Sequence, residues 1–172
     1  QIPGPPKVDY LFIIDDSCSM RNEQSVLATN LQSFIQFVEA QGLDYQLAMT
    51  TTDVSDGHPS EEGRLLPLIG NPADRVVTPL SYPSPQDAFL TNAQIGIDNR
   101  ASTEQGLEAA YLALSAAEEN GPYARFLRED ATLAVVLISD EPDASPRPVD
   151  FYVNYFRSIK GFRNANLFAF SV

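Results

Sequence analysis

The feature that most constrains this chain is an apolar run that ends abruptly in polar side chains. Residues 10–14 (YLFII) are apolar or aromatic, and residues 15–19 (DDSCS) follow them directly. An apolar run of this length between polar flanks is typical of a strand buried on both faces, as in a parallel sheet. In open α/β sheets, ligands bind just past the carboxyl ends of the strands. The polar cluster is therefore predicted to lie where such a fold places its binding site.

Within this cluster, Asp15, Ser17 and Ser19 occupy alternate positions. A loop that curls around a point can therefore direct one carboxylate and two hydroxyl oxygens toward the same place. Such a set of oxygens suits a hard cation such as Mg²⁺. A simpler interpretation is that these side chains only cap the helix that follows, because Asp and Ser are preferred cap residues.

A second apolar run further along the chain has the same organisation. Residues 131–139 (ATLAVVLIS) are typical of a central parallel strand, and the acidic segment 140–143 (DEPD) follows them. Because the carboxyl ends of parallel strands meet at one edge of a sheet, we expect Asp140 to lie near Asp15. The simpler interpretation places Asp140 in a turn before Pro142, without a function.

Helices and further strands alternate with these two runs. The apolar spacing predicts helices over residues 22–41, 101–120 and 149–160, and strands over residues 44–52 and 166–172. The last helix is expected to bury a face formed by Val149, Val153, Phe156 and Ile159. This order predicts an α/β domain with an open, mostly parallel sheet and helices on both faces.

The segment between residues 64 and 100 is the least regular part of the sequence. Short strands are expected at residues 65–69 and 76–77. Ser84 and the proline after it predict the start of a helix that ends near residue 93 or 95. Beyond this segment, Ser102 and Gln105 match a capping box for the next helix.

The chain is long enough for one domain with a sizeable core. We expect residues 1–7, which contain Pro and Gly, to be a linker and residues 8–172 to form the domain. The first residues lack the basic and apolar regions of a signal peptide, and the chain begins with Gln, so we expect that it has been trimmed. Because it stops directly after an expected strand, we also expect the last helix and an edge strand of the fold to be missing or to lie on another chain.

Charge and composition exclude several classes of function. The net charge of −12 argues against binding to nucleic acid and to an anionic membrane surface. No apolar run approaches the ~20 residues that span a bilayer, so direct membrane insertion is not expected. Cys18 is the only cysteine, which excludes an internal disulfide, and we expect it to be a small residue filling a tight loop. His58 is the only histidine, so no second His or Cys completes a zinc site around it.

The two acidic segments together resemble the metal-ion-dependent adhesion site of the von Willebrand factor A (vWA) domain family. The family's first segment, Asp-x-Ser-x-Ser after an apolar strand, is matched by Asp15, Ser17 and Ser19. Its third segment, an Asp after another apolar strand, is matched by Asp140. The likeness extends over nearly the whole chain and is greatest to bacterial extracytoplasmic members, which implies a secreted or cell-surface location.

The middle segment of the family's site is usually a threonine shortly before an amphipathic helix. Here Ala101 aligns with that threonine, so either Ser102 or Thr103 must reach the metal, or the site lacks this ligand. Two further departures are Cys18 and Glu141, each at a position where the family usually has Gly. Glu141 adds a carboxylate that can modify the surroundings of the metal.

The resemblance implies a metal-dependent protein-binding module for adhesion rather than an enzyme. Ser17 and Ser19 would bind Mg²⁺ directly, with Mn²⁺ or Ca²⁺ as alternatives, and Asp15 and Asp140 would bind it directly or through coordinated waters. One coordination position would then accept a Glu or Asp side chain of a partner protein. The module would form part of a larger chain or assembly.

Two alternatives remain open at this stage. The first is a phosphoryl-transfer or hydrolytic α/β enzyme with Asp15 or Asp16 as its nucleophile. Such an enzyme needs a positioned cation, yet Lys7 and Lys160 are the only lysines and neither follows the carboxyl end of an expected strand. The second is a degenerate vWA domain that binds partners without metal.

Overall fold

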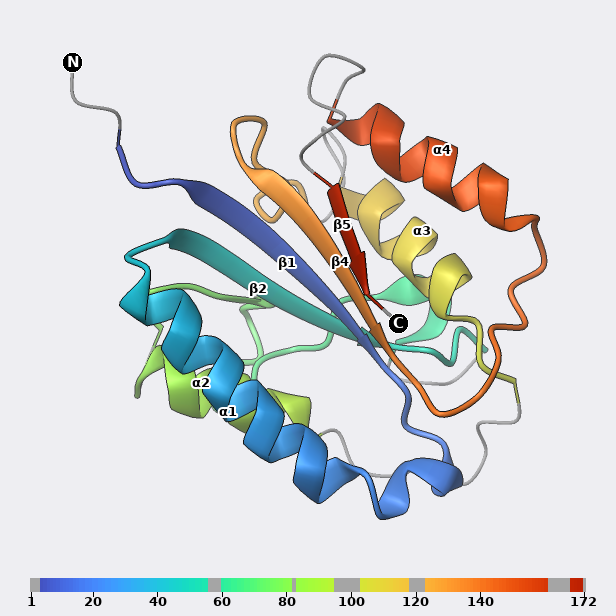
Figure 1. The fold of residues 1–172 in the computed structure, drawn as a ribbon, viewed down its shortest axis with the longest axis horizontal. Helices are drawn as coiled ribbons and strands as arrows, with labels where there is room; N and C mark the ends of the chain where they lie inside the picture. Colours follow the sequence, from blue (N-terminus) through green and yellow to red (C-terminus); the bar gives the residue numbers. More distant parts are fainter. Residues whose placement is uncertain are drawn as a thin grey trace.

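The computed structural model describes residues 4–55, 60–81, 83–94, 103–117, 123–160 and 168–171. Ala101, Ser102 and His58 therefore lie outside the described residues. Within these residues the chain forms a five-stranded sheet in the order β3-β2-β1-β4-β5 (Figure 1). Its strands are β1 (Lys7–Ile14), β2 (Asp44–Thr51), β3 (Val76–Val77), β4 (Thr132–Ile138) and β5 (Phe168–Ser171).

The pairing of the strands confirms the expected fold class. β1 pairs in parallel with both β2 and β4, and β4 pairs in parallel with β5. Only β3 runs antiparallel, against β2. The chain is thus an α/β fold with a mostly parallel sheet and β1 at its centre. The boundary between linker and domain stays a prediction, although β1 itself begins at Lys7.

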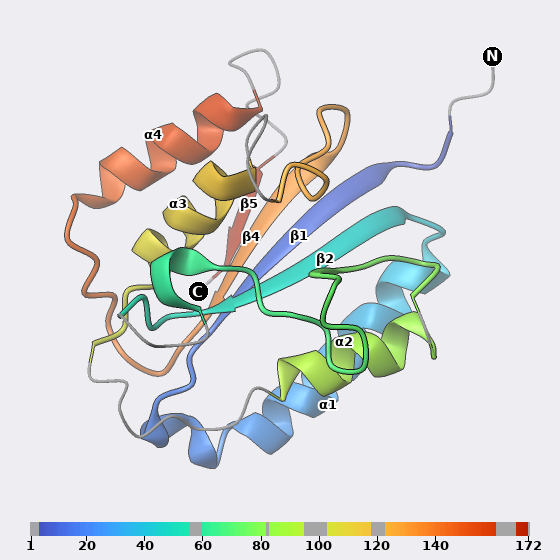
Figure 2. The same cartoon turned by 180° about the vertical axis from the view of Figure 1, so that it is seen from behind.

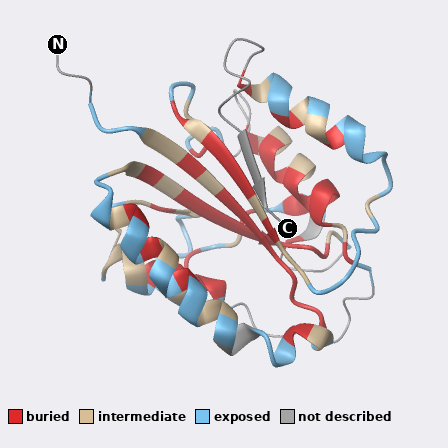
Figure 3. Ribbon diagram, viewed as in Figure 1, coloured by how far each residue is buried: buried red, intermediate tan, exposed pale blue. Residues whose placement is uncertain are grey.

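Helices cover both faces of this sheet. α1 (Gln24–Ala40) and α2 (Pro85–Ala93) lie on one face, and α3 (Gly106–Ala117) and α4 (Val149–Ile159) lie on the other (Figures 1 and 2). Successive residues of β1 feed the two cores: Leu11 and Ile13 pack toward α3, whereas Phe12 and Ile14 pack toward α1. This alternation explains why the central strands are apolar throughout, and Figure 3 shows them buried between helices with exposed outer faces.

Among the described residues, no helix is both long enough and apolar enough to cross a lipid bilayer.

In the irregular segment after β2, the structure confirms only some of the elements expected from the sequence. The strand at residues 76–77 is confirmed as β3. The strand expected at residues 65–69 is wrong, because Leu68 forms only an isolated bridge to Asn71. The helix start at Ser84 is confirmed, since its side chain accepts a hydrogen bond from the Asp87 amide at 3.0 Å.

The start of α3 lies later in the chain than the expected capping box. The helix begins at Gly106, so Thr103 does not occupy its cap position, and Ser102 lies outside the described residues. Its first free amides are instead satisfied from a distant loop: Leu107 N donates to Asp143 Oδ1 at 3.0 Å, and Glu108 N donates to Ser145 Oγ at 2.9 Å. A contact with a partner 36 or 37 residues away leaves no local pattern in the sequence.

The buried face of α4 matches the expectation only in part. Phe156 is buried as expected and Ile159 packs partly buried against the same core, but Tyr152 is buried and Val149 is 59% exposed. The shift follows from aromatic packing, because the Tyr152 ring lies edge-on to Tyr111 of α3 with 6.3 Å between centroids. Its hydroxyl also donates to Glu108 Oε2 at 2.7 Å, so this aromatic residue satisfies a polar group while it fills the interface.

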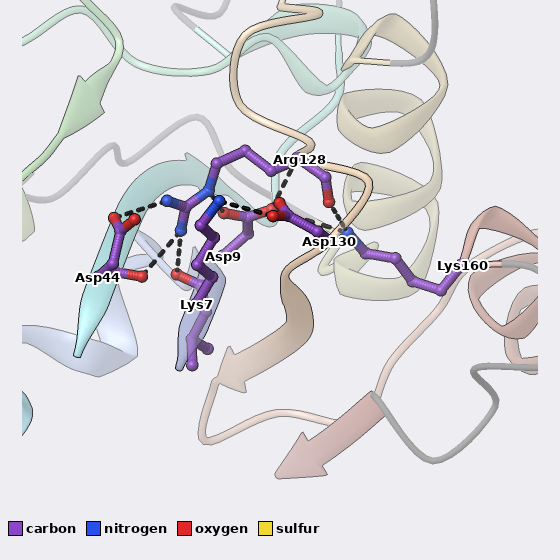
Figure 4. A network of polar contacts seen from close by, with 7 residues as sticks. Lys7, Asp9, Asp44, Arg128, Asp130 and Lys160 are labelled. Carbon is purple, nitrogen blue, oxygen red and sulfur yellow. Dashed lines mark hydrogen bonds and ion pairs between the residues drawn. The ribbon is translucent and has the colours of Figure 1, made fainter. Parts of the chain in front are cut away.

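A network of charged residues ties the amino ends of the central strands together (Figure 4). Asp9 of β1 is fully buried, and Arg128 donates to both of its carboxylate oxygens at 2.8 Å. The same guanidinium reaches Asp44 of β2 at 2.7 Å, and Lys160 Nζ lies 3.7 Å from Asp9 Oδ2. These residues stand at the end of the sheet opposite the acidic loops.

Candidate metal centre

The loop after β1 is held against the end of β4 by Asp15. Its backbone amide donates to the Ile138 carbonyl at 2.9 Å. One carboxylate oxygen accepts a bond from the Ser17 amide at 2.8 Å, and the other accepts one from the Ser139 hydroxyl at 2.5 Å. Asp15 is fully buried and its orientation is fixed by these bonds from both loops.

A chain of hydroxyl groups begins at Ser17, whose amide bonds Asp15, and leads toward the surface. The hydroxyl oxygens of Ser17 and Ser19 lie 2.7 Å apart, and the Ser19 hydroxyl donates to Asp140 Oδ1 at 2.9 Å. Ser17 is buried whereas Asp140 is exposed, so the chain leads from the interior to solvent. The structure thus brings together four of the six sequence-predicted site residues: Asp15, Ser17, Ser19 and Asp140.

The spacing of these oxygens fits an octahedral cation. Bonds of ~2.0–2.1 Å to Mg²⁺ place neighbouring ligand atoms about 2.9 Å apart. The Ser17–Ser19 and Ser19–Asp140 oxygen separations of 2.7 and 2.9 Å match that edge length. The Ser17–Ser19 pair and the Ser19–Asp140 pair can therefore each take adjacent positions around an ion. The serine hydroxyls are essential to this set, because in the described part of the chain no three His, Cys, Asp or Glu side chains form a metal cluster by themselves.

The middle segment places Glu104, rather than Thr103, toward the interior. Thr103 is exposed, whereas Glu104 is only 4% exposed and accepts a hydrogen bond from the Thr52 hydroxyl at Oε2. Burial raises the pKa of Glu104 to about 7; the Thr52 bond opposes this rise, and the charges of Asp15, Glu141 and Asp16 add to it.

Backbone hydrogen bonds join this middle segment to Thr52, just after β2, and to Ala144 in the loop after β4. Gln105 N donates to the Thr52 carbonyl at 3.0 Å, and Ala144 N donates to the Glu104 carbonyl at 2.7 Å. Sequence reasoning missed Ser139, whose hydroxyl contacts the Asp15 carboxylate. It could have been considered as the polar end of its strand.

The side chains of the acidic loop after β4 make different contacts. Asp140 contacts the Ser19 hydroxyl, while Asp143 accepts the Leu107 amide at the start of α3. Glu141 is exposed, and its backbone amide donates to the Ser139 hydroxyl at 3.0 Å. Asp143 therefore has a structural role that the sequence does not distinguish from that of Asp140.

Replacing Asp143 by Ala is expected to lower the free energy of unfolding by about 1 kcal/mol, because the Leu107 amide loses its acceptor. Urea denaturation followed by circular dichroism measures this change. Asp130→Ala is the control, since Asp130 is an exposed carboxylate at the opposite end of the sheet and should leave the unfolding midpoint nearly unchanged. Equal midpoints for the two variants would contradict a capping role for Asp143.

Cys18 does not fill the loop as expected. It is exposed and free, while Met20 is the buried residue of the short turn η1 (Cys18–Arg21) that follows the first loop. The apolar contact that fixes this turn to the core therefore comes from Met20.

The two lysines stand away from the candidate centre. Lys7 Nζ contacts Asp130 at 2.6 Å, and Lys160 Nζ donates to the Arg128 carbonyl at 2.5 Å, both in the network at the amino ends of the strands (Figure 4). Neither lysine can stabilise a phosphoryl group at Asp15 from there.

Comparisons with known proteins give distant structural neighbours only. No family model and no curated protein matches the chain. The pilus adhesin SpaC from Lactobacillus rhamnosus GG, in its open conformation, is 14% identical over 83% of this chain and 15% of SpaC, with a TM-score of 0.49. Proximal thread matrix protein 1 from the mussel byssus is 13% identical over 96% of this chain and 37% of that protein, with a TM-score of 0.48.

A further structure of this mussel protein, with the same identity, coverage and TM-score, is described as having a zinc-occupied MIDAS motif. These neighbours are adhesion or matrix proteins, and this chain spans well under half the length of each. The case for a metal centre rests on the geometry of the residues themselves.

Proposed function

We propose that this chain is a vWA-like adhesion module that binds a divalent cation at Asp15, Ser17, Ser19 and Asp140. The observation that carries the proposal is the run of oxygen contacts from Ser17 through Ser19 to Asp140, which links the ends of β1 and β4. Cap residues alone would need no such chain between two loops 121 residues apart. The metal proposed for the cell is Mg²⁺, with Mn²⁺ and Ca²⁺ as alternatives.

The residues of the centre have distinct tasks in this proposal. Ser17 and Ser19 supply neutral oxygens, so a bound cation keeps much of its positive charge. Asp15, fixed by the Ser139 hydroxyl and the Ser17 amide, holds the inner side of the site in place. Asp140 is exposed and marks the side from which a partner approaches.

The proposed partner is a protein that presents a Glu or Asp side chain to this open side. The chain carries a net charge of −12, which opposes the approach of an acidic group. A bound cation supplies the local positive charge that attracts the partner's carboxylate despite this repulsion. Binding of the partner should therefore depend on metal. We further propose that the module acts outside the cytoplasm of a bacterium, as part of a larger chain or assembly.

The test of metal binding uses the purified chain. Millimolar Mg²⁺, Mn²⁺ or Ca²⁺ should raise the melting temperature of the wild type, because a ligand that binds only the folded state stabilises it. Asp15→Ala should abolish the rise. Ser19→Ala removes a single hydroxyl from a half-buried side chain, so it should fold normally and still lose at least ~10-fold in affinity.

Asp74→Ala serves as the matched control, because this exposed carboxylate lies in the segment between β2 and α2. It should keep the full metal-dependent rise in melting temperature. A wild type with no shift at millimolar metal would refute the metal centre and leave a metal-free binding domain as the alternative.

The coordination position proposed for the partner can be tested with acetate as a probe carboxylate. In the Mn²⁺-loaded chain, acetate should displace a coordinated water and reduce the proton relaxation enhancement of the solvent. Sodium chloride at the same ionic strength is the control. An enhancement that does not change with acetate would contradict an open position for an acidic side chain.

A further inference from the structure

We infer that a groove at the β3 edge of the sheet binds an acidic, partly apolar peptide segment of a partner protein. The groove has a volume of about 950 Å³. One wall comes from residues between Leu68 and Pro83, and the other from the turn between Tyr123 and Phe126. None of the residues that line it belongs to the loops of the candidate metal centre, so this is a second binding site that goes beyond the proposed function.

The first support is the exposed apolar surface at this groove. Leu80 is 93% exposed and Ile69 is 64% exposed, more than any other large apolar side chain among the described residues. Both line the groove, and Val76, Tyr123 and Phe126 add apolar and aromatic surface to it. Apolar side chains that gather at one hollow beside aromatic residues are typical of an interaction surface, whereas single exposed ones are not.

The second support is the charge of the groove. Arg75 and Arg125 both line it, and within the described part of the chain neither forms an ion pair. Arg75 uses Nη1 for the carbonyls of Pro72 and Asp74. Acidic residues outnumber basic ones 23 to 11 in the chain, yet these two guanidinium groups have no carboxylate beside them. They are therefore available for a carboxylate from outside, which arginine binds with paired hydrogen bonds.

The third support is that both walls are fixed before any partner arrives. Asp74, the acidic residue among the described ones that line the groove, accepts Asn71 Nδ2 at 2.7 Å, and its carbonyl accepts the Leu68 amide at 2.9 Å. In the opposite wall, Gln46 turns its amide nitrogen toward the Phe126 carbonyl at 2.8 Å. A groove that is already ordered loses little entropy when it binds a peptide.

The two kinds of lining residue together define the occupant. A purely apolar segment would take water from Arg75 and Arg125 without pairing them, which is costly. A purely acidic segment would leave Leu80 and Ile69 exposed. A segment that combines Glu or Asp with Leu, Phe or Val satisfies both, and it needs no metal ion.

The experiment is a nuclear magnetic resonance titration of the ¹⁵N-labelled full chain in buffer that contains EDTA. The probes are synthetic decapeptides in which Glu alternates with Leu, Phe or Val. At least one of them should shift the amide signals of residues 68–81 and 123–126 and leave those of residues 15–19 unchanged. A matched peptide with Lys in place of Glu should bind at least ~10-fold more weakly, because like charges then meet at the groove.

The affinity of chain variants is measured by fluorescence anisotropy of the same labelled peptide. Arg125→Glu should weaken binding at least ~10-fold, and the exposed Arg157→Glu on α4, which has the same net charge, should change it less than about 2-fold. Leu80→Ser should weaken it at least ~5-fold, whereas Phe37→Ser, which removes another exposed apolar side chain, should not. Melting without peptide checks that all four variants fold.

Each contrary outcome has a definite meaning. Groove amides that respond to none of the acidic peptides at millimolar concentration would refute the inference. So would equal affinity for the Lys peptide, or equal losses in Arg125→Glu and Arg157→Glu. If light scattering shows a wild-type dimer that Leu80→Ser abolishes, the occupant is a second copy of this chain and the inference is wrong. Because EDTA is present throughout, failure of metal binding would leave these results unchanged.

Discussion

Replacing Arg128 by Ala is expected to lower the free energy of unfolding by about 3–5 kcal/mol. The guanidinium and backbone amide of Arg128 satisfy both oxygens of Asp9, whose side chain is fully buried at the start of β1. Removing one partner of a buried ion pair leaves the other charge without compensation, which is far more costly than losing an exposed pair. Lys160 compensates only in part, because its Nζ lies 3.7 Å from Asp9 Oδ2.

The pH dependence of this loss has a definite sign. Burial raises the pKa of Asp9 above its ordinary value of 3.8, while Arg128 and Lys160 lower it. Without Arg128 the pKa of Asp9 in the folded state rises further. A carboxyl group with a raised folded pKa disfavours folding as the pH rises through that pKa. The deficit of the variant should thus be largest at neutral pH and shrink on acidification toward the ordinary pKa of Asp.

Guanidinium denaturation of the wild type and Arg128→Ala at pH 7 and pH 5 measures both effects. Lys7→Ala is the control, because Lys7 forms an exposed ion pair with Asp130 at the same end of the sheet. Its unfolding midpoint should stay close to that of the wild type at both pH values. If the two variants lost the same stability, burial of Asp9 would not be the reason for the effect.

The fold could be predicted from the sequence because its strongest patterns are local. The apolar runs that became β1 and β4 are buried on both faces, so they lack any polar alternation that would indicate an edge strand. The helices show their apolar stripes at helical spacing. The fold of residues 65–69 was not predictable in this way, since Leu66 N bonds the Met49 carbonyl without forming a ladder.

The same difference between local patterns and distant contacts decides which residues of the candidate site could be predicted. Asp15, Ser17 and Ser19 lie within one short motif, and Asp140 follows an apolar strand, so their meeting at one sheet edge follows from parallel pairing. Glu104 and Asp143 depend on contacts between distant segments. Whether an acidic residue there faces the site, caps a helix or faces solvent is decided by how α3 docks against the loop after β4. This docking produces no recognisable pattern in the sequence around Glu104.

Replacing Gly63 by Ala is expected to destabilise the chain by about 2–5 kcal/mol. Gly63 ends the short turn η2 (Glu61–Gly63) with φ +69°, in the left-handed region that side chains other than Gly disfavour by roughly 1–2 kcal/mol. An added Cβ would lie 2.6 Å from Leu112 Cβ, 2.7 Å from the Ala109 carbonyl oxygen and 2.9 Å from the Ala113 amide nitrogen. Two of these atoms belong to the α3 backbone, so the turn or the helix must move, at a cost of about 1–3 kcal/mol.

Gly42→Ala separates the two causes. Gly42 follows α1 with φ +63°, yet no atom lies within 4 Å of an added Cβ, so this variant should lose only the roughly 1–2 kcal/mol of backbone strain. Urea denaturation of both variants gives the difference, and equal losses would mean that the contact with α3 is not tight.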